Sequence, residues 1–495
     1  MEKEQQFTDQ EQARRDKLAK YKALGVDPYG GKYERTDDSF SIHNKTDALS
    51  NEELEAKQIY VSVAGRIMAI RRMGKASFIN IKDKNGDIQG YIGIDVVGEH
   101  SYDVFKLADI GDIVGLYGRL MRTRTGELTI RVEKYTHLTK ALRPLPEKFH
   151  GLTDVEERYR RRYLDLIVND ESRRIALLRP QIIRAMQRYF DEQGFVEVET
   201  SVLSPILGGA NAKPFVTHHN SLDRDFYLRI ATELPLKRLL VGGLERVYEF
   251  GRLFRNEGMD TRHNPEFTTV ELYQAYGDLQ DMRHIAENVF RSTAQSVLGT
   301  TTIPWGDKTI DLGKPFRWVS MSELVKEKTG IDFTKKISYE EACGYAKQNK
   351  IKVEKHMTGV GHILNAFFET FCEGELVQPT FVHTYPIEVS PLTKKCEDSR
   401  FTERFEIFIN GLEFGNAYTE LNDPMDQKER FEDQLKAKAL GDDEANEMDT
   451  DFVEALEYGM PPAGGIGIGI DRFVMLLANQ TSIREVILFP CMRDK

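Results

Sequence analysis

Cysteine is scarce in this sequence, and long apolar runs are absent. The four cysteines, Cys343, Cys372, Cys396 and Cys491, lie far apart and form no CxxC pair. That spacing argues against a disulfide framework and against a structural zinc site. The N-terminal stretch MEKEQQFTDQEQARRDKLAKYKALG is charged from its first residues, and no later stretch is long and uncharged enough to cross a bilayer. We therefore expect a cytoplasmic protein with reduced thiols and no membrane partner.

Positive charge is also in short supply. The 68 Lys and Arg residues are outnumbered by 79 Asp and Glu residues, which gives a formal net charge of −11. Because non-specific binding to phosphate backbones requires a broad positive field, this balance argues against a protein that binds nucleic acid non-specifically along its length. It remains compatible with a local basic face. At 495 residues the chain is expected to fold into two or three domains.

The N-terminal part of the chain changes its hydrophobic spacing near residue 56. Residues 1–55 are expected to form a helical extension, because apolar side chains recur there at roughly helical spacing among many charges. Residues 56–142 contain short β-rich runs with a hairpin turn signal at Asn85-Gly86. Five strands in this length indicate an OB-fold β-barrel, an architecture that binds single-stranded nucleic acid.

The remainder is expected to be a second, larger domain. Residues 143–155 are rich in proline and glycine and are predicted to be a linker. Residues 156–495 mix strands and helices, with a largely helical insertion near residues 281–375. The predicted fold class is therefore α+β and multidomain.

The barrel region is basic although the chain as a whole is acidic. Its cations are Arg66, Arg71, Arg72, Lys75, Lys82, Lys84, Arg119, Arg122 and Arg124. Two interpretations stay open from composition alone. The cations form a nucleic-acid face with Phe78 as a stacking platform, or they only keep the barrel soluble while Phe78 is an ordinary core residue.

The stretch FRNEGMDTRHNPEF, residues 254–267, predicts a polar hairpin. If the residues on both sides of its loop are extended, five side chains share one face of a sheet: Arg255, Glu257, Phe267, Glu271 and Tyr273. Such a face combines a cation, two carboxylates, a phenol and an aromatic ring. A solvated surface hairpin is the alternative explanation of this stretch considered alone.

Three separated stretches resemble the signature motifs of class II aminoacyl-tRNA synthetases. GFVEVETSVLSPILGGANAKPF (194–215) resembles motif 1, the hairpin stretch resembles motif 2, and GGIGIGIDRFVMLL (464–477) resembles motif 3. Together with the N-terminal barrel, RIATEL (229–234) and GLEFGNAYTELNDP (411–424), these motifs resemble the bacterial-type lysyl-tRNA synthetases of subclass IIb. This resemblance implies a catalytic domain built on an antiparallel β-sheet flanked by helices. It also implies activation of L-lysine by ATP and transfer of lysine to the 3′ end of tRNA(Lys).

The resemblance assigns Arg255 and Arg472 to catalysis. A guanidinium fork suits Arg255, because it can hold the α-phosphate and the attacking carboxylate together. Around ATP the resemblance places a larger set: Arg255, Glu257, His263, Asn264, Phe267, Glu413 and Arg472. Glu257 is expected to accept from the adenine amino group, and Phe267 to stack on the ring. The alternative for Asp471 and Arg472 is an ordinary ion pair at a helix start.

The resemblance places eight residues around the substrate lysine: Gly208, Glu233, Arg255, Glu271, Tyr273, Asn416, Tyr418 and Glu420. Magnesium accompanies ATP and needs oxygen ligands, which the resemblance implies are Glu413 and Glu420. Because a regular strand places residues seven apart on opposite faces, a β-bulge is expected at Gly415. Pro235 departs from the pattern of related enzymes and puts nearby side-chain contacts in doubt.

In the barrel, the resemblance assigns anticodon contacts to Arg71, Phe78, Gln89 and Glu127. It also implies a homodimer built by motif 1. Three other interpretations stay open: an aspartyl or asparaginyl enzyme, a non-charging RNA-binding paralogue, and a protein-modifying lysyl ligase. The first is disfavoured because its pocket needs a cation where this chain has Glu271 and Tyr273, and the third because this chain carries the N-terminal barrel.

Overall fold

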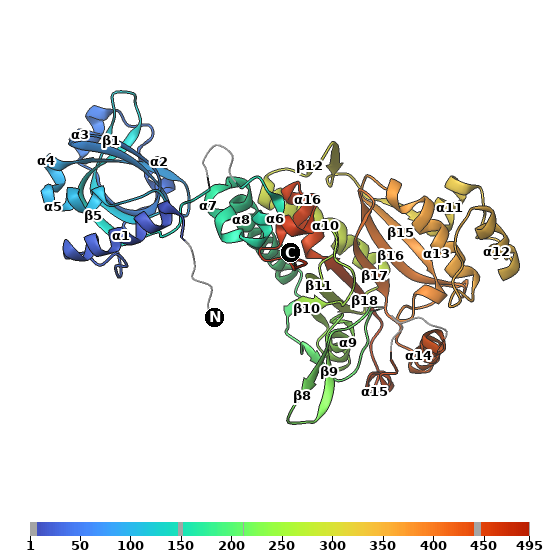
Figure 1. Cartoon of the computed structure of the whole chain (residues 1–495). Helices are drawn as coiled ribbons and strands as arrows, with labels where there is room; N and C mark the ends of the chain where they lie inside the picture. Colours follow the sequence, from blue (N-terminus) through green and yellow to red (C-terminus); the bar gives the residue numbers. More distant parts are fainter. Residues whose placement is uncertain (1–6, 147–151, 211, 440–446, 495) are drawn as a thin grey trace. The chain divides into compact units, whose positions relative to one another are not determined.

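The computed structural model describes residues 7–146, 152–210, 212–439 and 447–494. The chain divides into two compact units, Met1–Thr153 and Asp154–Lys495 (Figure 1). Part of the stretch expected to be a linker, residues 147–151, lies outside the described residues.

The first unit is built on a closed five-stranded barrel. Its strands run in the order β1-β2-β3-β5-β4, with β3 and β5 parallel and the other neighbouring pairs antiparallel. The bounds are β1 (Tyr60–Met73), β2 (Ala76–Lys82), β3 (Asp87–Gly93), β4 (Ile113–Arg122) and β5 (Leu128–Thr139). Period-2 alternation turns Ile79, Ile81 and Ile130 into the barrel core. The predicted OB-fold architecture is therefore confirmed.

The N-terminal helices share this core. The helices of the unit are α1 (Asp9–Ala23), α2 (Ser39–Thr46), α3 (Asn51–Lys57), α4 (Ile94–Val97) and α5 (Glu99–Lys106). Each of the first three contributes a fully buried apolar side chain to the barrel cluster, namely Tyr21, Ile42 and Leu54. The predicted extension is helical, and it packs as part of the barrel unit.

The second unit is built on an eight-stranded sheet. Its order is β14-β15-β16-β17-β18-β11-β10-β6, and only the outermost pairs, β14-β15 and β10-β6, are parallel. The bounds are β6 (Val196–Glu197), β10 (Arg246–Phe254), β11 (Glu266–Ala275), β14 (Arg317–Ser320), β15 (Thr380–Pro386), β16 (Phe401–Ile409), β17 (Leu412–Thr419) and β18 (Ala463–Gly469). The expected, largely antiparallel sheet flanked by helices is confirmed.

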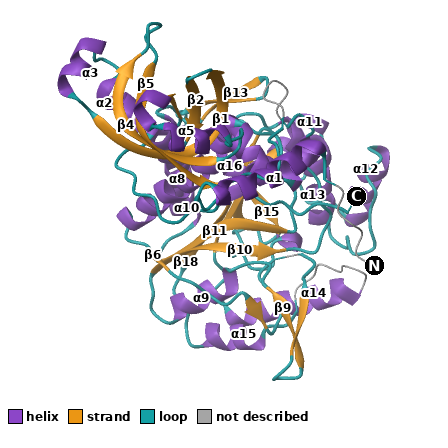
Figure 2. Ribbon diagram, turned by 60° about the vertical axis from the view of Figure 1, so that its left-hand side comes forward, coloured by secondary structure: helices purple, strands orange, loops and turns teal. Residues whose placement is uncertain are grey.

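Helices cover the two faces of this sheet unequally. Three helices pack on one face and form the largest hydrophobic cluster with it: α8 (Asp170–Glu192), α10 (Leu279–Leu298) and α16 (Ile470–Ala478). The opposite face carries α9 (Glu233–Val241) and α15 (Thr450–Glu457), which pack near β11 and β18 (Figure 2). Helix α14 (Pro424–Ala439) lies with α15. This second face carries a cavity.

Smaller elements surround the sheet. A three-stranded sheet has the order β7-β9-β8, from β7 (Leu203–Ser204), β8 (Val216–His219) and β9 (Arg224–Leu228). Residues 281–375 hold most of α10, the hairpin β12 (Thr302–Trp305) and β13 (Lys308–Asp311), strand β14, and the helices α11 (Met321–Thr329), α12 (Tyr339–Gln348) and α13 (Val360–Phe371). Helices α11–α13 form their own hydrophobic cluster against β15 and β16. The expected insertion is thus helical in large part, but β14 belongs to the main sheet.

Candidate active site

A cavity of about 410 Å³ opens on the sheet face that α8, α10 and α16 leave uncovered. Its floor comes from β11, β17 and β18, and its rim comes from the loop between β10 and β11 and from residues 389–393. Twelve of the residues expected at the substrates line it: Glu233, Arg255, Glu257, His263, Asn264, Phe267, Glu271, Tyr273, Glu413, Asn416, Tyr418 and Arg472. These twelve residues come from four separate segments of the chain, which thus meet in one hollow.

The β10-β11 hairpin brings the predicted polar face together. Its register pairs Leu253 with Phe267 and Glu249 with Glu271, and the Arg255 N–H donates to the Pro265 carbonyl just past the last strand pair (2.8 Å). The Arg255 guanidinium carbon lies 5.2 Å from the centre of the Phe267 ring. All five predicted side chains of this face line the cavity, so the hairpin is more than a solvated surface feature.

The hairpin loop is stiffened by its own polar contacts. Asp260 accepts from the backbone N–H groups of Arg262 (2.6 Å) and His263 (2.8 Å), and its carboxylate contacts the His263 ring. Burial alone would raise the pKa of Asp260, but these hydrogen bonds lower it to about 2. The far ring nitrogen of His263 lies 3.5 Å from the Arg472 guanidinium. A cation from motif 3 and an imidazole from motif 2 therefore face each other across the cavity mouth.

The Asn264 side chain forms hydrogen bonds within the hairpin and to the C-terminal segment. Its amide NH₂ donates to the Glu266 carbonyl (2.6 Å), and its amide oxygen accepts from the Cys491 N–H (3.1 Å). It is 9% exposed. It lines the cavity as expected, but its side chain is already used to join the loop to the C-terminal segment.

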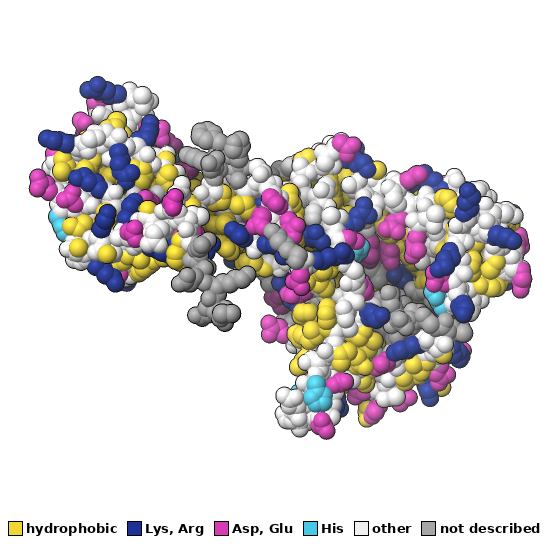
Figure 3. All heavy atoms as spheres, viewed as in Figure 1, with side chains coloured by type: hydrophobic (Ala, Val, Ile, Leu, Met, Phe, Trp, Pro, Cys, Tyr) yellow, Lys and Arg dark blue, Asp and Glu magenta, His cyan; other side chains and the backbone are white. Residues whose placement is uncertain are grey.

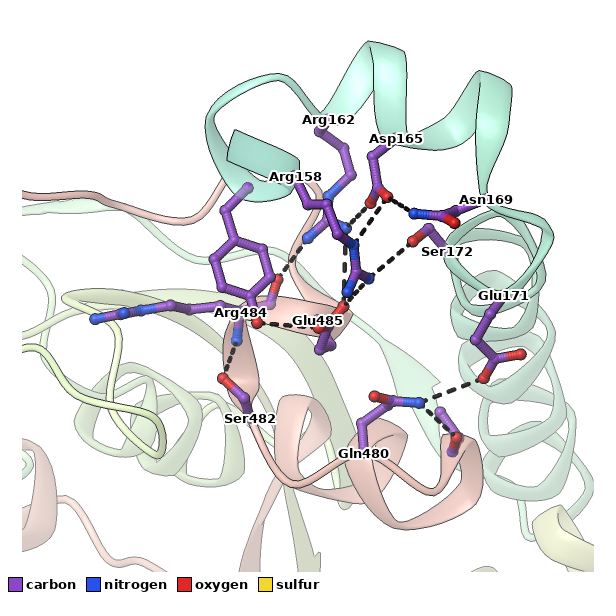
Figure 4. Close-up of polar contacts among 12 residues, drawn as sticks. Arg158, Arg162, Asp165, Asn169, Glu171, Ser172, Gln480, Ser482, Arg484 and Glu485 are labelled. Atoms are coloured by element: carbon purple, nitrogen blue, oxygen red, sulfur yellow. Dashed lines mark hydrogen bonds and ion pairs between the residues drawn. The ribbon is translucent and has the colours of Figure 1, made fainter. Parts of the chain in front are cut away.

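A network of buried ion pairs holds that C-terminal segment (Figure 4). Arg162, from α7 (Arg162–Val168), donates to the Arg484 carbonyl (2.6 Å), the Leu488 carbonyl (3.1 Å) and the Asp165 carboxylate (2.6 Å). Arg158, from α6 (Val155–Arg160), bridges Asp165 and Glu485. The short helix α17 (Ile483–Val486) is thereby fixed, and the Ile483 N–H donates to the Thr261 carbonyl in the hairpin loop (2.8 Å).

Asp471 does not pair with its neighbour Arg472. Its carboxylate accepts from Arg179 of α8 (2.5 Å) and from the Thr268 N–H of β11 (2.7 Å). Arg472 instead donates to the Glu413 carbonyl (2.5 Å) and points along the cavity. The helix-start ion pair considered from sequence is therefore wrong, because the two charges are held by different elements.

The inner end of the cavity gathers buried carboxylates. Glu271 accepts from the Tyr273 hydroxyl (3.2 Å) and the Thr232 N–H (3.3 Å), and Glu233 accepts from the Tyr418 hydroxyl (2.5 Å). Burial and the neighbouring Glu233 charge raise the pKa of Glu271 to about 7. A carboxyl group with such a pKa changes charge readily when a cation approaches.

Two residues expected at the substrate lysine do not line the cavity. Glu420 is 1% exposed, and burial raises the pKa of its carboxyl group while the Lys237 ammonium, with which it pairs, opposes this. It fits beneath β18 because a β-carbon on Gly465 would come 2.1 Å from its Oε1 atom. In place of Gly208, the next residues, Gly209 and Ala210, line the wall.

A β-bulge lies beside Gly415, as expected. The register with β16 pairs Ile407 with Gly415 and Phe408 with Glu413, so Phe414 is the extra residue. Phe414 turns into the hydrophobic core, and Glu413 shares the cavity face with Asn416 and Tyr418. The predicted β-bulge, which changes which residues of β17 face the cavity, is therefore present.

The predicted pair of metal ligands is nevertheless separated. Glu413 and Glu420 stand at opposite ends of β17, so a rise of about 3.3 Å per residue places their α-carbons roughly 20 Å apart, too far for one ion. The carboxylate that accompanies Glu413 is Glu406 of β16, which lines the same cavity. Burial and the Glu413 charge raise the pKa of Glu406 to about 7. Sequence reasoning overlooked Glu406 because its partner is set by strand pairing.

Arg404 was also overlooked. Its guanidinium donates to the Asn416 amide oxygen (2.9 Å), the Glu406 carboxylate (2.6 Å) and the Val389 carbonyl (2.6 Å). It therefore orients two cavity-facing side chains at once. The alternation of Arg404 and Glu406 on one strand face, just before GLEFGNAYTE, was the available signal.

Pro235 does not disturb the neighbouring Glu233. It occupies the first turn of α9, where a backbone N–H has no partner within the helix and proline costs little. Glu233 keeps its contacts to Tyr418 and to Lys237, one turn further along the helix. The doubt raised by the sequence is resolved in favour of an intact helix start.

On the barrel, β1, β2 and β3 present the expected aromatic face. Arg71 opposes Phe78, and Phe78 opposes Tyr91, with the two ring centres 5.2 Å apart. The Arg71 guanidinium carbon lies 5.8 Å from the Phe78 ring centre. Because the buried residues are the alternate ones, Phe78 is half-buried on the outer face and is not a core residue. Tyr91 was not predicted. It adds a second aromatic ring beside Phe78 on this face.

Gln89 and Glu127 lie near this face in different settings. Gln89 opposes Asn80 and is 6% exposed, with its side-chain oxygen accepting from the Thr129 hydroxyl (3.3 Å). Glu127 is exposed just before β5. Both remain predictions as base-reading groups.

Several barrel cations support the barrel itself. Arg66 donates to the Gly111 carbonyl (2.7 Å), Arg72 to the Ala108 carbonyl (2.9 Å) and Arg122 to the Asp47 carbonyl (2.7 Å). Figure 3 shows further Lys and Arg side chains across the visible face of the first unit. Some of the basic side chains of this region therefore stabilise the barrel through hydrogen bonds, and others contribute to its surface charge.

Comparison with known proteins agrees with this geometry. Residues 154–493 match the family model described as tRNA synthetases class II (D, K and N), and residues 61–138 match an OB-fold nucleic acid binding domain. The chain belongs to the class II tRNA synthetases. Within that class it belongs to the lysine–tRNA ligase family, as its full-length relatives show.

Three of these relatives cover almost the whole chain. The lysine–tRNA ligase of Bacillus subtilis (strain 168) is 54% identical over 492 residues, covering 99% of this chain and 98% of its own. That of Enterococcus faecalis is 54% identical over 488 residues, covering 98% of each chain. That of Halalkalibacterium halodurans is 56% identical over 483 residues, covering 97% of this chain and 96% of its own. Among the described residues, no helix has the length and apolar character needed to span a membrane.

Proposed function

We propose that this protein activates L-lysine with ATP and transfers the lysyl group to tRNA(Lys). The observation that carries this proposal is the inner end of the cavity, where buried carboxylates stand in a pocket continuous with Arg255, Phe267 and Arg472. A pocket for aspartate would require a cation at the position of Glu271, and a neutral asparagine side chain would leave that buried carboxylate without a cation. Intact catalytic arginines likewise disfavour a paralogue that binds RNA without charging it.

Activation joins an ionised carboxylate to the α-phosphorus of ATP, so no general base is required. The site must screen negative charge and align the attack. Arg255 lines the cavity together with Glu271 and lies beside the Phe267 ring, so its fork would hold both reacting groups. Phe267 would stack on adenine, Glu257 would accept from its amino group, and His263 and Arg472 would meet the outer phosphates.

The carboxylates of Glu406 and Glu413 fit a magnesium ion that arrives with ATP. They line the cavity together, and their mutual repulsion is relieved by a divalent cation. Among the residues that the structure describes, no group of three or more acidic, His or Cys side chains could hold a metal. Magnesium would therefore take its remaining oxygen ligands from phosphate and water, as this ion usually does. The bound ion would neutralise charge on the phosphates.

The two units would have separate roles in the reaction. The catalytic cavity would make lysyl-adenylate, and the barrel face formed by Arg71, Phe78 and Tyr91 would stack on anticodon bases. Gln89 and Glu127 would supply hydrogen bonds to base edges. This division explains why a synthetase domain carries a separate nucleic-acid module.

We further propose a homodimer that works in the cytoplasm. The exposed apolar residues Leu177, Val196, Val202 and Leu203 lie on α8 and in motif 1, and β6 forms an edge of the main sheet. A two-fold contact through this region would cover them. The four cysteines carry free thiols, which fits a reducing compartment. Sedimentation at micromolar concentration tests the dimer, and a stable active monomer would contradict it.

The decisive experiment is pyrophosphate exchange with each of the twenty amino acids, with and without added tRNA. Lysine alone should support exchange in the absence of tRNA, and charging should follow only with tRNA(Lys). Exchange that prefers aspartate or asparagine would overturn the assignment of the pocket. Lysine exchange without charging of any tRNA would overturn the second half of the proposal.

A further inference from the structure

The outer face of the barrel carries basic side chains beyond the strands that bear Phe78. Arg131 of β5 is the register partner of Tyr91 on β3, and Arg119 of β4 is in turn the register partner of Arg131. Tyr91 itself stands opposite Phe78. Because directly paired residues project from the same face of a sheet, these four side chains lie side by side across β2, β3, β5 and β4.

A second pair of exposed aromatic rings lies at the far end of this face. Tyr60 of β1 is the register partner of Arg119, and its ring stacks on that of Tyr117 on β4, with ring centres 5.8 Å apart and planes 23° apart. The two tyrosines are 44% and 41% exposed. Tyr117 is opposite Lys134 of β5, which is also exposed. The outer face therefore alternates aromatic rings with cations, as surfaces that bind single-stranded nucleic acid do.

A β-bulge brings Lys134 to this face. Residues three apart on a regular strand point to opposite faces, so Arg131 and Lys134 would normally be separated. The register with β4 passes from Lys134 to Val132 between Tyr117 and Gly118, which makes Glu133 the extra residue. Gly118 permits the close approach of the strands, because a β-carbon there would collide with the Arg131 carbonyl. Three cations, Arg119, Arg131 and Lys134, thus form a basic row on the outer face.

The basic row has no acidic counterpart. Among the residues that the structure describes, no carboxylate lies within ion-pair distance of Arg119, Arg131 or Lys134. Arg119 donates to the amide oxygen of Gln58, which is neutral (3.2 Å). Arg119 and Arg131 are both half-buried and stand directly opposite each other, an arrangement that is unfavourable for like charges. A bound anion would relieve this repulsion.

We propose that the basic row binds backbone phosphates of the RNA strand that continues from the Phe78–Tyr91 aromatic pair onto β5 and β4. Guanidinium forks match the oxygens of a phosphate group. Three steps between neighbouring strands, of about 4.8 Å each, place Arg119 roughly 14 Å along the sheet from Phe78. An OB-fold contacts about 4–16 nucleotides of a single strand, so an RNA strand stacked on Phe78 is long enough to reach the row. The proposal rests on the tRNA-binding role proposed above for the barrel.

The test measures the salt dependence of tRNA(Lys) binding by Arg131→Gln in the full chain. Each phosphate contact to a single strand contributes about 0.7 to the slope of log K against log salt, so the slope should become shallower by about 0.7. Extrapolated to about 1 M salt, this slope corresponds to a loss of affinity of about fourfold at about 0.15 M. The double variant with Arg119→Gln should lose about twice as much slope. Fluorescence anisotropy with an unmodified tRNA(Lys) transcript measures both.

Lys45→Gln is the matched control. It removes the same charge from an exposed residue of α2 in the same unit, where the ammonium pairs with Asp37. Its salt slope should stay at the wild-type value, and Arg131→Lys, which keeps the charge, should retain most of the slope. If Lys45→Gln and Arg131→Gln changed the slope equally, only net charge would matter and the proposal would be wrong. A wild-type protein that failed to bind tRNA(Lys) would contradict the proposed function instead, so the two failures are distinct.

A second readout separates phosphate binding from base reading. The loss of affinity in Arg131→Gln should be the same for tRNA(Lys) and for a transcript with an altered anticodon, because phosphates carry no sequence information. A loss confined to tRNA(Lys) would make Arg131 a base-reading residue and overturn the proposal. Unchanged tRNA binding would leave an acidic protein as the occupant of this surface, and would overturn it as well.

Thermal unfolding excludes a purely structural explanation. The midpoint of Arg131→Gln should not fall, because the substitution removes a pair of like charges. A lower midpoint together with an unchanged salt slope would assign Arg131 a structural role and contradict the proposal. Lys134→Gln, at an exposed position, carries the same prediction for the salt slope if Arg131→Gln does not fold.

Discussion

The catalytic cavity and the barrel face both place polar side chains on one face of a β-sheet, but they hold them differently. In the cavity, Glu233, Glu271 and Arg404 are bound by neighbours from other elements. On the barrel, Phe78 and Tyr91 are half-buried, their ring centres lie 5.2 Å apart, and Arg71 lies over Phe78. Buried polar groups lose much when one partner is removed, whereas a stacking face loses one contact at a time. Substitutions in the cavity should therefore reduce activity sharply, whereas single substitutions on the barrel should reduce tRNA charging only moderately.

The largest loss of activity is expected from a substitution of Arg255. Arg255→Lys keeps a positive charge but removes the fork that would hold phosphate and carboxylate together. Lysine-dependent pyrophosphate exchange should fall roughly 100- to 1000-fold in kcat, as when one donor to a developing charge is lost. Arg252→Lys, an exposed pair partner of Glu266 on the same hairpin, is the matched control and should stay near wild type. Equal losses in the two variants would contradict the special role of Arg255.

The next largest effect is expected at Glu271. Glu271→Gln keeps the shape and removes the charge, so kcat/KM for lysine should fall roughly 10- to 100-fold, the worth of a charged hydrogen bond. The ATP KM should change little. Exchange with norleucine, which lacks the ammonium, should lose much less, and Glu266→Gln on the exposed edge of the hairpin is the control. An unchanged ratio of lysine to norleucine would show that Glu271 does not select the substrate.

A milder effect is expected from acidification. Burial and Glu233 raise the pKa of Glu271 to about 7, so its carboxyl group is largely ionised at pH 8 and largely protonated at pH 6. The ionised form binds an ammonium group, so the lysine KM should rise as the pH falls through 7, by about tenfold from pH 8 to pH 6. Initial rates at several pH values, with ATP saturating, measure this. A lysine KM that stayed flat from pH 8 to pH 6 would contradict the role of the Glu271 charge.

The smallest effect is expected on the barrel. Phe78→Ala removes one stacking surface but leaves Tyr91 in place, so tRNA charging should weaken by about 1 kcal/mol, the lower end of a single stacking contact. Lysine-dependent pyrophosphate exchange without tRNA should remain normal. The double variant with Tyr91→Ala should lose charging further. A matching loss of exchange in Phe78→Ala would break the division of labour between the units.

The sequence by itself determined the elements whose evidence is local. Period-2 alternation and turn residues predicted the barrel strands, and the hairpin of residues 254–267 predicted which side chains of β10 and β11 share a face. The bulge beside Gly415 was also predicted, although the metal-ligand pair that led to this prediction is wrong. Such features depend on backbone geometry over a few residues, so the residue order carries them.

Tertiary structure decided which charges meet. Glu406 joins Glu413 because β16 and β17 are paired, although the family resemblance had implied Glu420 as the partner. Lys237 meets Glu420 because α9 packs against the cavity side of the sheet, and Asp471 meets Arg179 because α8 packs against α16. Electrostatic pairing follows distance in space and the exclusion of water, and neither quantity can be read from the order of residues along the chain.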